Sequence, residues 1–255
     1  MRKILKKIIP LQIRRNVKKE IGTHLNNFNY TKEKWRLYFE LKKKPKIFCI
    51  SVQRTGTTSV GHFFKIHGYN VAGWDVSYKN KWTVLWNNGD FEDIFKSLDF
   101  RTNQVFEDGP WWGPEFYKFL FHKFPGAKFV LFTRDSDQWF NSMISHSNGR
   151  TLGNTKLHCK VYRRENDFNN LVYSQTSQDL IDYKIDNLLT LSENKEHYIN
   201  IYEMHNREVI EYFSKHSSES LFTCQLEDPL KWVKLGRFFG IDVPEGFEAH
   251  QNKSK

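Results

Sequence analysis

The chain has 255 residues, 39% of them hydrophobic and 16% aromatic, and a formal charge of +10 at neutral pH. This length suits one large α/β domain, and the apolar content excludes a disordered chain. The positive charge favours a polyanionic partner: a nucleotide, a nucleic acid, an acidic glycan or an anionic membrane surface. No stretch approaches the ~20 apolar residues that a membrane span needs.

Residues 1–44 form a basic N-terminal arm, with a helix expected over Lys32–Leu41. The first apolar run is interrupted by Lys6, Lys7 and Pro10, and no small-residue cleavage site follows, so a secretory signal is not expected. Two interpretations stay open: a solvated arm, or an interfacial segment attracted to anionic lipid. The three cysteines are far apart in the sequence and are expected to be reduced. We therefore expect a cytoplasmic protein, free or peripheral at the inner face of the membrane.

Residues 45–255 alternate short apolar runs with helical patterns, which predicts an α/β domain with a central parallel β-sheet flanked by helices. Strands are expected at residues 46–51, 69–72, 104–108, 128–133 and 220–225. Helices are expected at residues 59–67, 115–124, 137–146, 198–214 and 229–239. The polar segment 149–167 lacks a clear period and is predicted to be a long surface loop. Because ligands of such sheets bind at the carboxyl ends of strands, the residues that follow strands are the first candidates for a site.

The first candidate is the segment SVQRTGTTS, which begins where the strand at residues 46–51 ends. Gly56 allows a backbone conformation that a β-carbon hinders, and the N–H groups of residues 54–59 would point at one anion. Nearby hydroxyl groups add donors: Thr57, Thr58 and Ser59. A triphosphate-binding loop would carry glycine at Ser51 and lysine at Thr57, so the usual triphosphate apparatus is missing. The cation of this loop is Arg54 instead.

This segment resembles the 5′-phosphosulfate loop of the single-domain sulfotransferases in the P-loop superfamily, which use 3′-phosphoadenosine 5′-phosphosulfate (PAPS). The family's loop reads roughly P-[KR]-x-G-T-[TS], and the chain matches it from Arg54 to Thr58, with Gln53 in place of proline. The resemblance covers about residues 46–245. It implies a PAPS-dependent sulfotransferase with the matching α/β fold.

The resemblance includes KFVLFTRDSDQWFNSM, in which Arg134 ends a predicted strand and Ser142 lies eight residues further on. In the family, an arginine and a serine with this spacing bind the 3′-phosphate of the donor. A guanidinium grips phosphate in a fork, and a hydroxyl two helical turns further on can face it. The donor site that the resemblance implies, without a metal ion, consists of Arg54, Thr55, Gly56, Thr57, Thr58, Ser59, Arg134 and Ser142.

Sulfuryl transfer needs charge stabilisation at the leaving oxygen and a general base for the acceptor hydroxyl. Arg54 is the candidate for the first role. Asp108, in FEDGP, matches an Asp-x-Pro element of the family, and Glu107 precedes it; strand alternation should point the two side chains in different directions. Which of them is the base stays open, as does a purely structural role for Asp108 in capping the turn. His62 and His67 are weaker candidates, expected to pack or to be solvated.

Several aromatic and basic residues allow two interpretations each. Trp111, Trp112 and Trp74 are either core residues or a platform for the acceptor. Lys231 and Trp232 follow the last strand and are candidates to close over the nucleotide. The basic residues of the polar segment either are solvated or contact the donor's 3′-phosphate or an anionic acceptor: Arg150, Lys156, Lys160, Arg163 and Arg164.

The leading hypothesis is transfer of a sulfuryl group from PAPS to an acceptor hydroxyl, expected on a glycan or a glycolipid precursor, although a small aromatic or alcohol acceptor fits as well. One alternative is a nucleotide-dependent kinase of the same superfamily, against which the missing lysine argues. The other is a basic nucleic-acid-binding protein. Its basic residues are dispersed and no recognition motif is present, so no nucleic-acid partner is expected.

Overall fold

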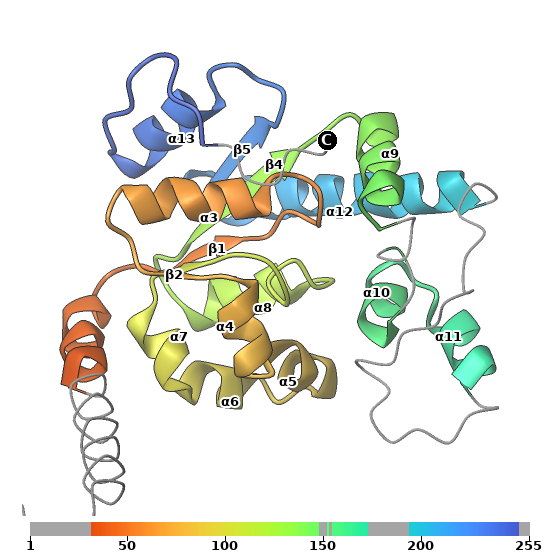
Figure 1. Cartoon of the computed structure of the whole chain (residues 1–255), viewed down its shortest axis with the longest axis horizontal. Helices are drawn as coiled ribbons and strands as arrows, with labels where there is room; N and C mark the ends of the chain where they lie inside the picture. The colour runs from red at the N-terminus through yellow and green to blue at the C-terminus, as the bar shows by residue number, and fades with distance from the viewer. Residues whose placement is uncertain (1–31, 148–151, 153–154, 173–193, 250–255) are drawn as a thin grey trace, which may run out of the picture. The chain divides into compact units, whose positions relative to one another are not determined.

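The computed structural model describes residues 32–147, 152, 155–172 and 194–249 (Figure 1). Contacts divide the chain into two compact units, Met1–Lys44 and Pro45–Lys255. In the first unit, the described residues include the expected helix, at 32–41. None of the helices among the described residues is both long and apolar enough to cross a membrane.

The second unit is built on a five-stranded sheet in the order β2-β3-β1-β4-β5, in which every pair of neighbours is parallel. The strands are β1 (Ile47–Cys49), β2 (Val71–Ala72), β3 (Val105–Phe106), β4 (Lys128–Thr133) and β5 (Leu221–Gln225). Each expected strand is present, and the predicted parallel α/β architecture is confirmed. The central strand β1 pairs with β3 on one side and β4 on the other, so the carboxyl ends of these three strands meet at one edge.

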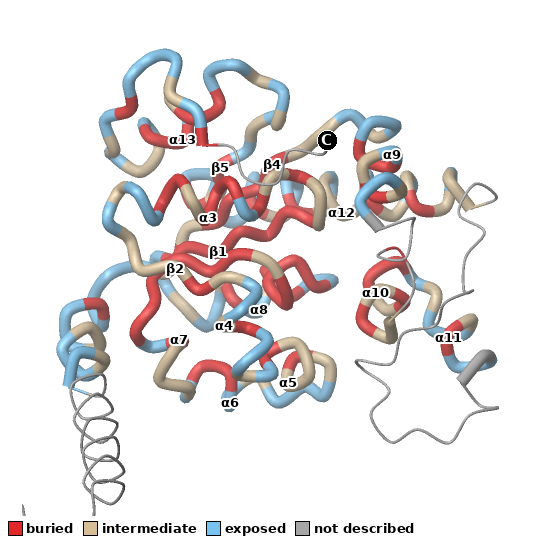
Figure 2. The backbone as a smooth tube through the Cα atoms, viewed as in Figure 1, coloured by how far each residue is buried: buried red, intermediate tan, exposed pale blue. Residues whose placement is uncertain are grey.

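Helices cover both faces of the sheet, as Figures 1 and 2 show. On one face, Cys49, Val130 and Phe132 pack with α3 (Thr57–Ile66) and α13 (Lys231–Phe239). On the other face, Phe48, Phe106 and Leu131 belong to a larger core. Three helices contribute to that core: α8 (Phe116–Lys123), α9 (Ser136–Ser147) and α12 (Lys195–His216). All five helices were predicted, with bounds that differ by a few residues.

Four short helices between β2 and β3 were not predicted: α4 (Trp74–Lys79), α5 (Trp82–Asn88), α6 (Phe91–Lys96) and α7 (Leu98–Thr102). Helices of five to seven residues are too short to show a helical period in the sequence. They join the larger core through buried aromatic and aliphatic residues: Trp82, Trp86, Ile94, Phe95 and Phe100.

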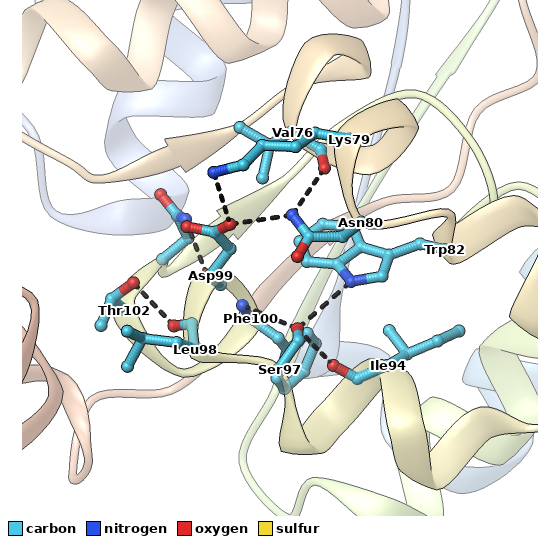
Figure 3. Close-up of polar contacts among 11 residues, drawn as sticks. Val76, Lys79, Asn80, Trp82, Ile94, Ser97, Leu98, Asp99, Phe100 and Thr102 are labelled. Carbon is cyan, nitrogen blue, oxygen red and sulfur yellow. Dashed lines mark hydrogen bonds and ion pairs between the residues drawn. The ribbon is translucent and has the colours of Figure 1, made fainter.

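Polar side chains connect these short helices (Figure 3). The Asp99 carboxylate accepts a hydrogen bond from Asn80 Nδ2 at 2.8 Å and lies 3.6 Å from Lys79 Nζ. Ser97 Oγ caps α7 by accepting from Phe100 N at 3.3 Å, and also accepts from Trp82 Nε1 at 3.2 Å. Apart from the cap on α7, these contacts join residues that are 15 or more positions apart in the sequence.

The prediction of a long surface loop at 149–167 is wrong for the described part of that segment. It contains α10 (Lys156–Val161) and the start of α11 (Glu165–Val172). Thr155 caps α10, since its Oγ1 accepts from His158 N at 3.2 Å. The segment packs because α10 buries its apolar side chains: Leu157, Cys159 and Val161.

Candidate active site

The loop between β1 and α3 has the backbone of an anion site. Arg54 and Gly56 both adopt left-handed conformations, with φ of 65° and 83°. Gly56 is the N-cap of α3 and supplies no side-chain cap, and the first turn carries no acidic residue. A Cβ at Gly56 would lie 2.7 Å from Leu226 Cδ1, so any larger residue would require the Leu226 side chain to move. The first N–H groups of a helix have no intrahelical acceptor, which leaves this helix end suited to an anion.

Buried hydroxyls fix the start of the loop. Ser51 Oγ accepts from Phe132 N, on β4, at 2.7 Å. Thr55 Oγ1 donates to Val52 O at 2.6 Å and is fully buried. Thr55 was expected to bind the donor; in the structure its hydroxyl closes the loop, which leaves its backbone N–H as the group to meet a ligand.

Gln53, which replaces the family's proline, is held by two aromatic side chains. Trp139 Nε1 donates to Gln53 O at 3.0 Å, and Tyr162 OH donates to Gln53 Oε1 at 3.1 Å. Sequence analysis missed both partners, since they lie 86 and 109 residues away along the chain. The two bonds give the loop a rigidity that proline supplies through its ring.

A cluster of basic groups lies at the carboxyl ends of β1 and β4. Arg54 Nε donates to Ser142 Oγ at 3.0 Å, and Arg54 Nη1 lies 3.4 Å from His146 Nδ1. Burial, followed by the charge of Arg134, lowers the pKa of Arg54. Burial, followed by the charge of Arg54, lowers the pKa of His146. The structure thus brings together the expected residues Arg54, Ser142 and Arg134, and adds His146, for which the sequence carried no signal.

Arg134 is positioned from α12. Tyr202 OH accepts from Arg134 N at 2.7 Å and donates to Arg134 O at 3.0 Å, and its ring stacks on Trp139 with centroids 4.4 Å apart. The guanidinium Nε donates to Glu227 Oε1 at 2.9 Å. The backbone of Arg134 is therefore fixed, while its side chain is paired with a carboxylate from the segment after β5.

Glu107 directly follows β3 and lies in a space that two glycines leave. A Cβ at Gly61 would lie 2.8 Å from Glu107 Cγ, and one at Gly73 would lie 2.7 Å from Glu107 Oε1. Its Oε2 atom is buried and meets no hydrogen-bond partner in the described part of the chain. Burial, followed by the charges of Asp108 and Asp75, raises the pKa of Glu107 to about 8. At neutral pH this carboxyl is mostly protonated.

Asp108 is the second residue after β3 and is less buried than Glu107. Its backbone is left-handed, with φ of 70°, and its Oδ1 accepts from Gly109 N at 2.7 Å. Burial raises the pKa of Asp108, and the hydrogen bond from Gly109 opposes this effect. The side chain thus makes the local contact that a turn-capping role requires, and the residue as a whole is half-buried.

Most aromatic alternatives are resolved in favour of the core. Trp111 and Trp112 are buried, so neither is an acceptor platform. Lys231 and Trp232 are also buried, and Trp232 stacks on Phe63 at 5.5 Å, so the expectation that they close over the nucleotide is wrong. Trp74 is 61% exposed.

The remaining polar candidates make local contacts. His67 Nδ1 lies 2.7 Å from Phe63 O, one helical turn earlier. His62 is half-buried. Arg164 Nε donates to Asp167 Oδ2 at 2.5 Å, and Lys160 Nζ lies 4.5 Å from the centre of the Trp86 ring. Arg150 lies outside the described residues.

Comparison with known proteins identifies the family. A model of the sulfotransferase domain matches residues 46–255, which is most of the chain and includes both the loop at Arg54 and the segment from Arg134 to Ser142. A search of curated proteins found no significant match. The family match agrees with the parallel sheet and confirms the resemblance that the two motifs indicated. The chain therefore belongs to a sulfotransferase family of the P-loop-like superfamily.

Proposed function

We propose that the protein transfers a sulfuryl group from PAPS to an acceptor hydroxyl. The observation that carries this proposal is the 3.0 Å hydrogen bond between Arg54 and Ser142. It joins the loop after β1 to the helix after β4, and these two strands are paired neighbours. Two anion sites so close together suit a donor that carries phosphate at both its 5′ and 3′ positions.

The chemistry of the described residues fits such a donor. The N-terminus of α3, with Gly56 as its cap, would hold the 5′-phosphosulfate, and Arg134 with Ser142 would hold the 3′-phosphate. The bound donor supplies a sulfuryl group on a good leaving group. Arg54 would neutralise the negative charge that grows on the phosphate oxygen as the sulfur–oxygen bond breaks.

We infer that Asp108 is the general base. A base must reach the acceptor hydroxyl, and Asp108 is half-buried at the sheet edge. Glu107 is only 7% exposed, and its raised pKa keeps it mostly protonated at neutral pH. Asp108 would take the acceptor's proton as the new oxygen–sulfur bond forms, and Glu107 would act by positioning the strand end.

We infer that the acceptor hydroxyl belongs to a glycan or glycolipid. Trp74 and Tyr78 are 61% and 63% exposed, and their rings stack with centroids 5.1 Å apart. Both belong to α4, whose N-cap is Gly73. On the same helix, Ser77 Oγ donates to Gly109 O at 2.6 Å, directly after the proposed base Asp108. An exposed aromatic pair on this helix suits the apolar face of a sugar ring. A cytoplasmic location is part of the same proposal and rests on the three free cysteines.

Calorimetric titration tests the donor. Wild type, Arg134→Ala and a control, Arg237→Ala on the exposed side of α13, are titrated with 3′,5′-adenosine bisphosphate in EDTA and with ATP and Mg²⁺. The bisphosphate should bind without metal, and Arg134→Ala should weaken it about tenfold or more, because a charged hydrogen bond is lost. Arg237→Ala should bind like wild type. Tight Mg²⁺-dependent ATP binding without bisphosphate binding would overturn the proposal and favour a kinase.

Transfer of labelled sulfate from PAPS to a panel of glycans and glycolipids tests the base. Asparagine tolerates left-handed backbone, so Asp108→Asn keeps the fold while removing the carboxylate. We expect transfer to fall by roughly 10²–10⁴-fold with bisphosphate binding retained. Glu107→Gln should keep most of the activity. The reverse result would assign the base to Glu107.

A further inference from the structure

The positive charge of the chain is concentrated in its first 44 residues. They hold 14 of the 39 Lys and Arg residues but only 3 of the 29 Asp and Glu, which gives a formal charge of +11. Residues 45–255, which contain the whole proposed active site, therefore carry a formal charge of −1. The boundary coincides with the division between the two compact units. The excess positive charge thus lies in the unit that contains none of the proposed donor-binding residues, so donor binding does not explain it.

The same unit exposes aromatic side chains. In the helix at 32–41, Trp35 is 48% exposed and Phe39 is 68% exposed. Four residues apart, they share one side of the helix, with ring centroids 6.3 Å apart. Tyr38 lies against Phe39 at 5.3 Å. Basic residues surround this cluster along the sequence: Lys32, Lys34, Arg36, Lys42, Lys43 and Lys44. A large exposed aromatic cluster within a basic segment indicates a contact surface.

We propose that residues 1–44 bind the protein to the surface of an anionic lipid bilayer. Trp35 and Phe39 would enter the interface between headgroups and acyl chains, where amphipathic aromatic rings are favoured. The surrounding lysines and arginines would contact anionic headgroups. The contact is peripheral, and it places the catalytic unit beside acceptors held in that membrane.

The apolar content of the segment favours lipid over nucleic acid. Its sequence begins MRKILKKIIP, in which pairs of large aliphatic residues alternate with cations. A nucleic-acid phosphate backbone attracts cations but offers no place for such aliphatic pairs, whereas a bilayer interface accepts both. The charge and the aromatic cluster therefore both favour an anionic bilayer as the partner of residues 1–44.

Flotation of the full-length protein with vesicles tests the proposal. Vesicles of phosphatidylcholine alone are compared with vesicles that also contain phosphatidylglycerol. Wild type should float only with the anionic vesicles, and Trp35→Ala/Phe39→Ala should lower its partition coefficient about tenfold or more. Lys42→Gln/Lys43→Gln/Lys44→Gln should weaken binding and reduce its dependence on salt.

The chain offers a matched control for the aromatic pair. Trp74 and Tyr78 have the same spacing and similar exposure but lie in the unit whose formal charge is −1. The vesicles contain no glycan for these two residues to bind, so Trp74→Ala/Tyr78→Ala should bind vesicles like wild type. Circular dichroism of each variant establishes that it is folded, so the result does not depend on the proposed sulfotransferase activity.

Three results would overturn the membrane proposal. The first is equal binding to neutral and anionic vesicles, and the second is unchanged binding after Trp35→Ala/Phe39→Ala. The third is absence of vesicle binding together with tight, salt-sensitive binding to a DNA duplex, which would assign the arm to nucleic acid.

Discussion

Arg54 and Asp108 share an uncommon backbone conformation. Both are non-glycine residues with positive φ, 65° and 70°, and they follow the paired strands β1 and β3. Such a conformation costs roughly 1–3 kcal/mol and persists only where the surroundings fix it. Residues that stabilise a reaction must be aimed accurately, so this strain at two neighbouring strand ends supports their assignment to the chemistry.

Glu107 is a titratable group whose surroundings destabilise its ionised form. The ordinary pKa of 4.5 is raised to about 8, first by burial and then by Asp108 and Asp75. Between these two values the unfolded chain releases the proton while the folded chain retains it. Stability therefore falls as pH rises from about 5 to about 8 and levels off above that range.

Replacing Glu107 by glutamine should remove this pH dependence. Glutamine resembles the neutral carboxyl in shape, so wild type should lose up to about 4 kcal/mol relative to Glu107→Gln between pH 5 and pH 8. Urea unfolding at both pH values measures the change. Glu245→Gln, at an exposed carboxylate, controls for the lost charge. A difference between wild type and Glu107→Gln that is identical at both pH values would show that Glu107 is ionised throughout.

Among the elements, the loop from β1 to α3 depends on its glycine in two ways. Gly56 faces two constraints, a φ of 83° and the nearby Leu226 side chain, which follows β5. Gly68, after α3, has a φ of 81°, but a Cβ at this position would meet no atom of the described residues within 4 Å beyond its chain neighbours. Substituting each glycine by alanine therefore distinguishes two free-energy costs. At Gly68 only the left-handed backbone contributes, whereas at Gly56 the contact with Leu226 is added.

Gly56→Ala should be more harmful than Gly68→Ala. Gly68→Ala should cost roughly 1–2 kcal/mol through its backbone alone and leave bisphosphate affinity unchanged. Gly56→Ala should lose about 1 kcal/mol more, since Leu226 must move, and should weaken bisphosphate binding because the loop shifts. Leu226→Ala combined with Gly56→Ala should recover the stability that Gly56→Ala loses through its contact with Leu226. Denaturant unfolding and calorimetry check these outcomes; equal losses and equal affinities would contradict a role of the loop in binding.

The elements also show which features sequence alone could predict. The buried parallel strands are continuous apolar runs, and each was expected at its place. The loop at Arg54 and the Arg134–Ser142 spacing are local patterns, so they were visible as well. By contrast, α4–α7 have no readable period, and the contacts that fix Gln53 and Arg134 come from Tyr162 and Tyr202, far away in the chain. Such partners are set by folding and leave no local signal.

At the scale of the whole molecule, the catalytic unit has the core of an independent domain. Phe48, on the central strand, lies within ring-contact distance of aromatic residues from several elements: Phe100, Phe106, Trp111, Phe124 and Phe129. The chain is tied to this core as it enters β1, because Lys46 Nζ donates to Phe100 O at 3.1 Å. Burial lowers the pKa of Lys46 to about 8, in keeping with a lysine drawn into the domain.

A protein that begins at Pro45 should therefore fold and bind nucleotide. The family match begins at residue 46, and the first strand begins at Ile47. We expect bisphosphate affinity like that of the full chain and a melting temperature within about 4 °C, which for a domain of this size corresponds to roughly 1–2 kcal/mol. The shortened protein should also stop floating with anionic vesicles, because it has lost the +11 charge of residues 1–44. Calorimetry, thermal unfolding and flotation on the same preparation measure all three. Aggregation, or loss of bisphosphate binding, would show instead that the basic arm is part of the catalytic unit, and retained flotation would move the membrane contact to residues 45–255.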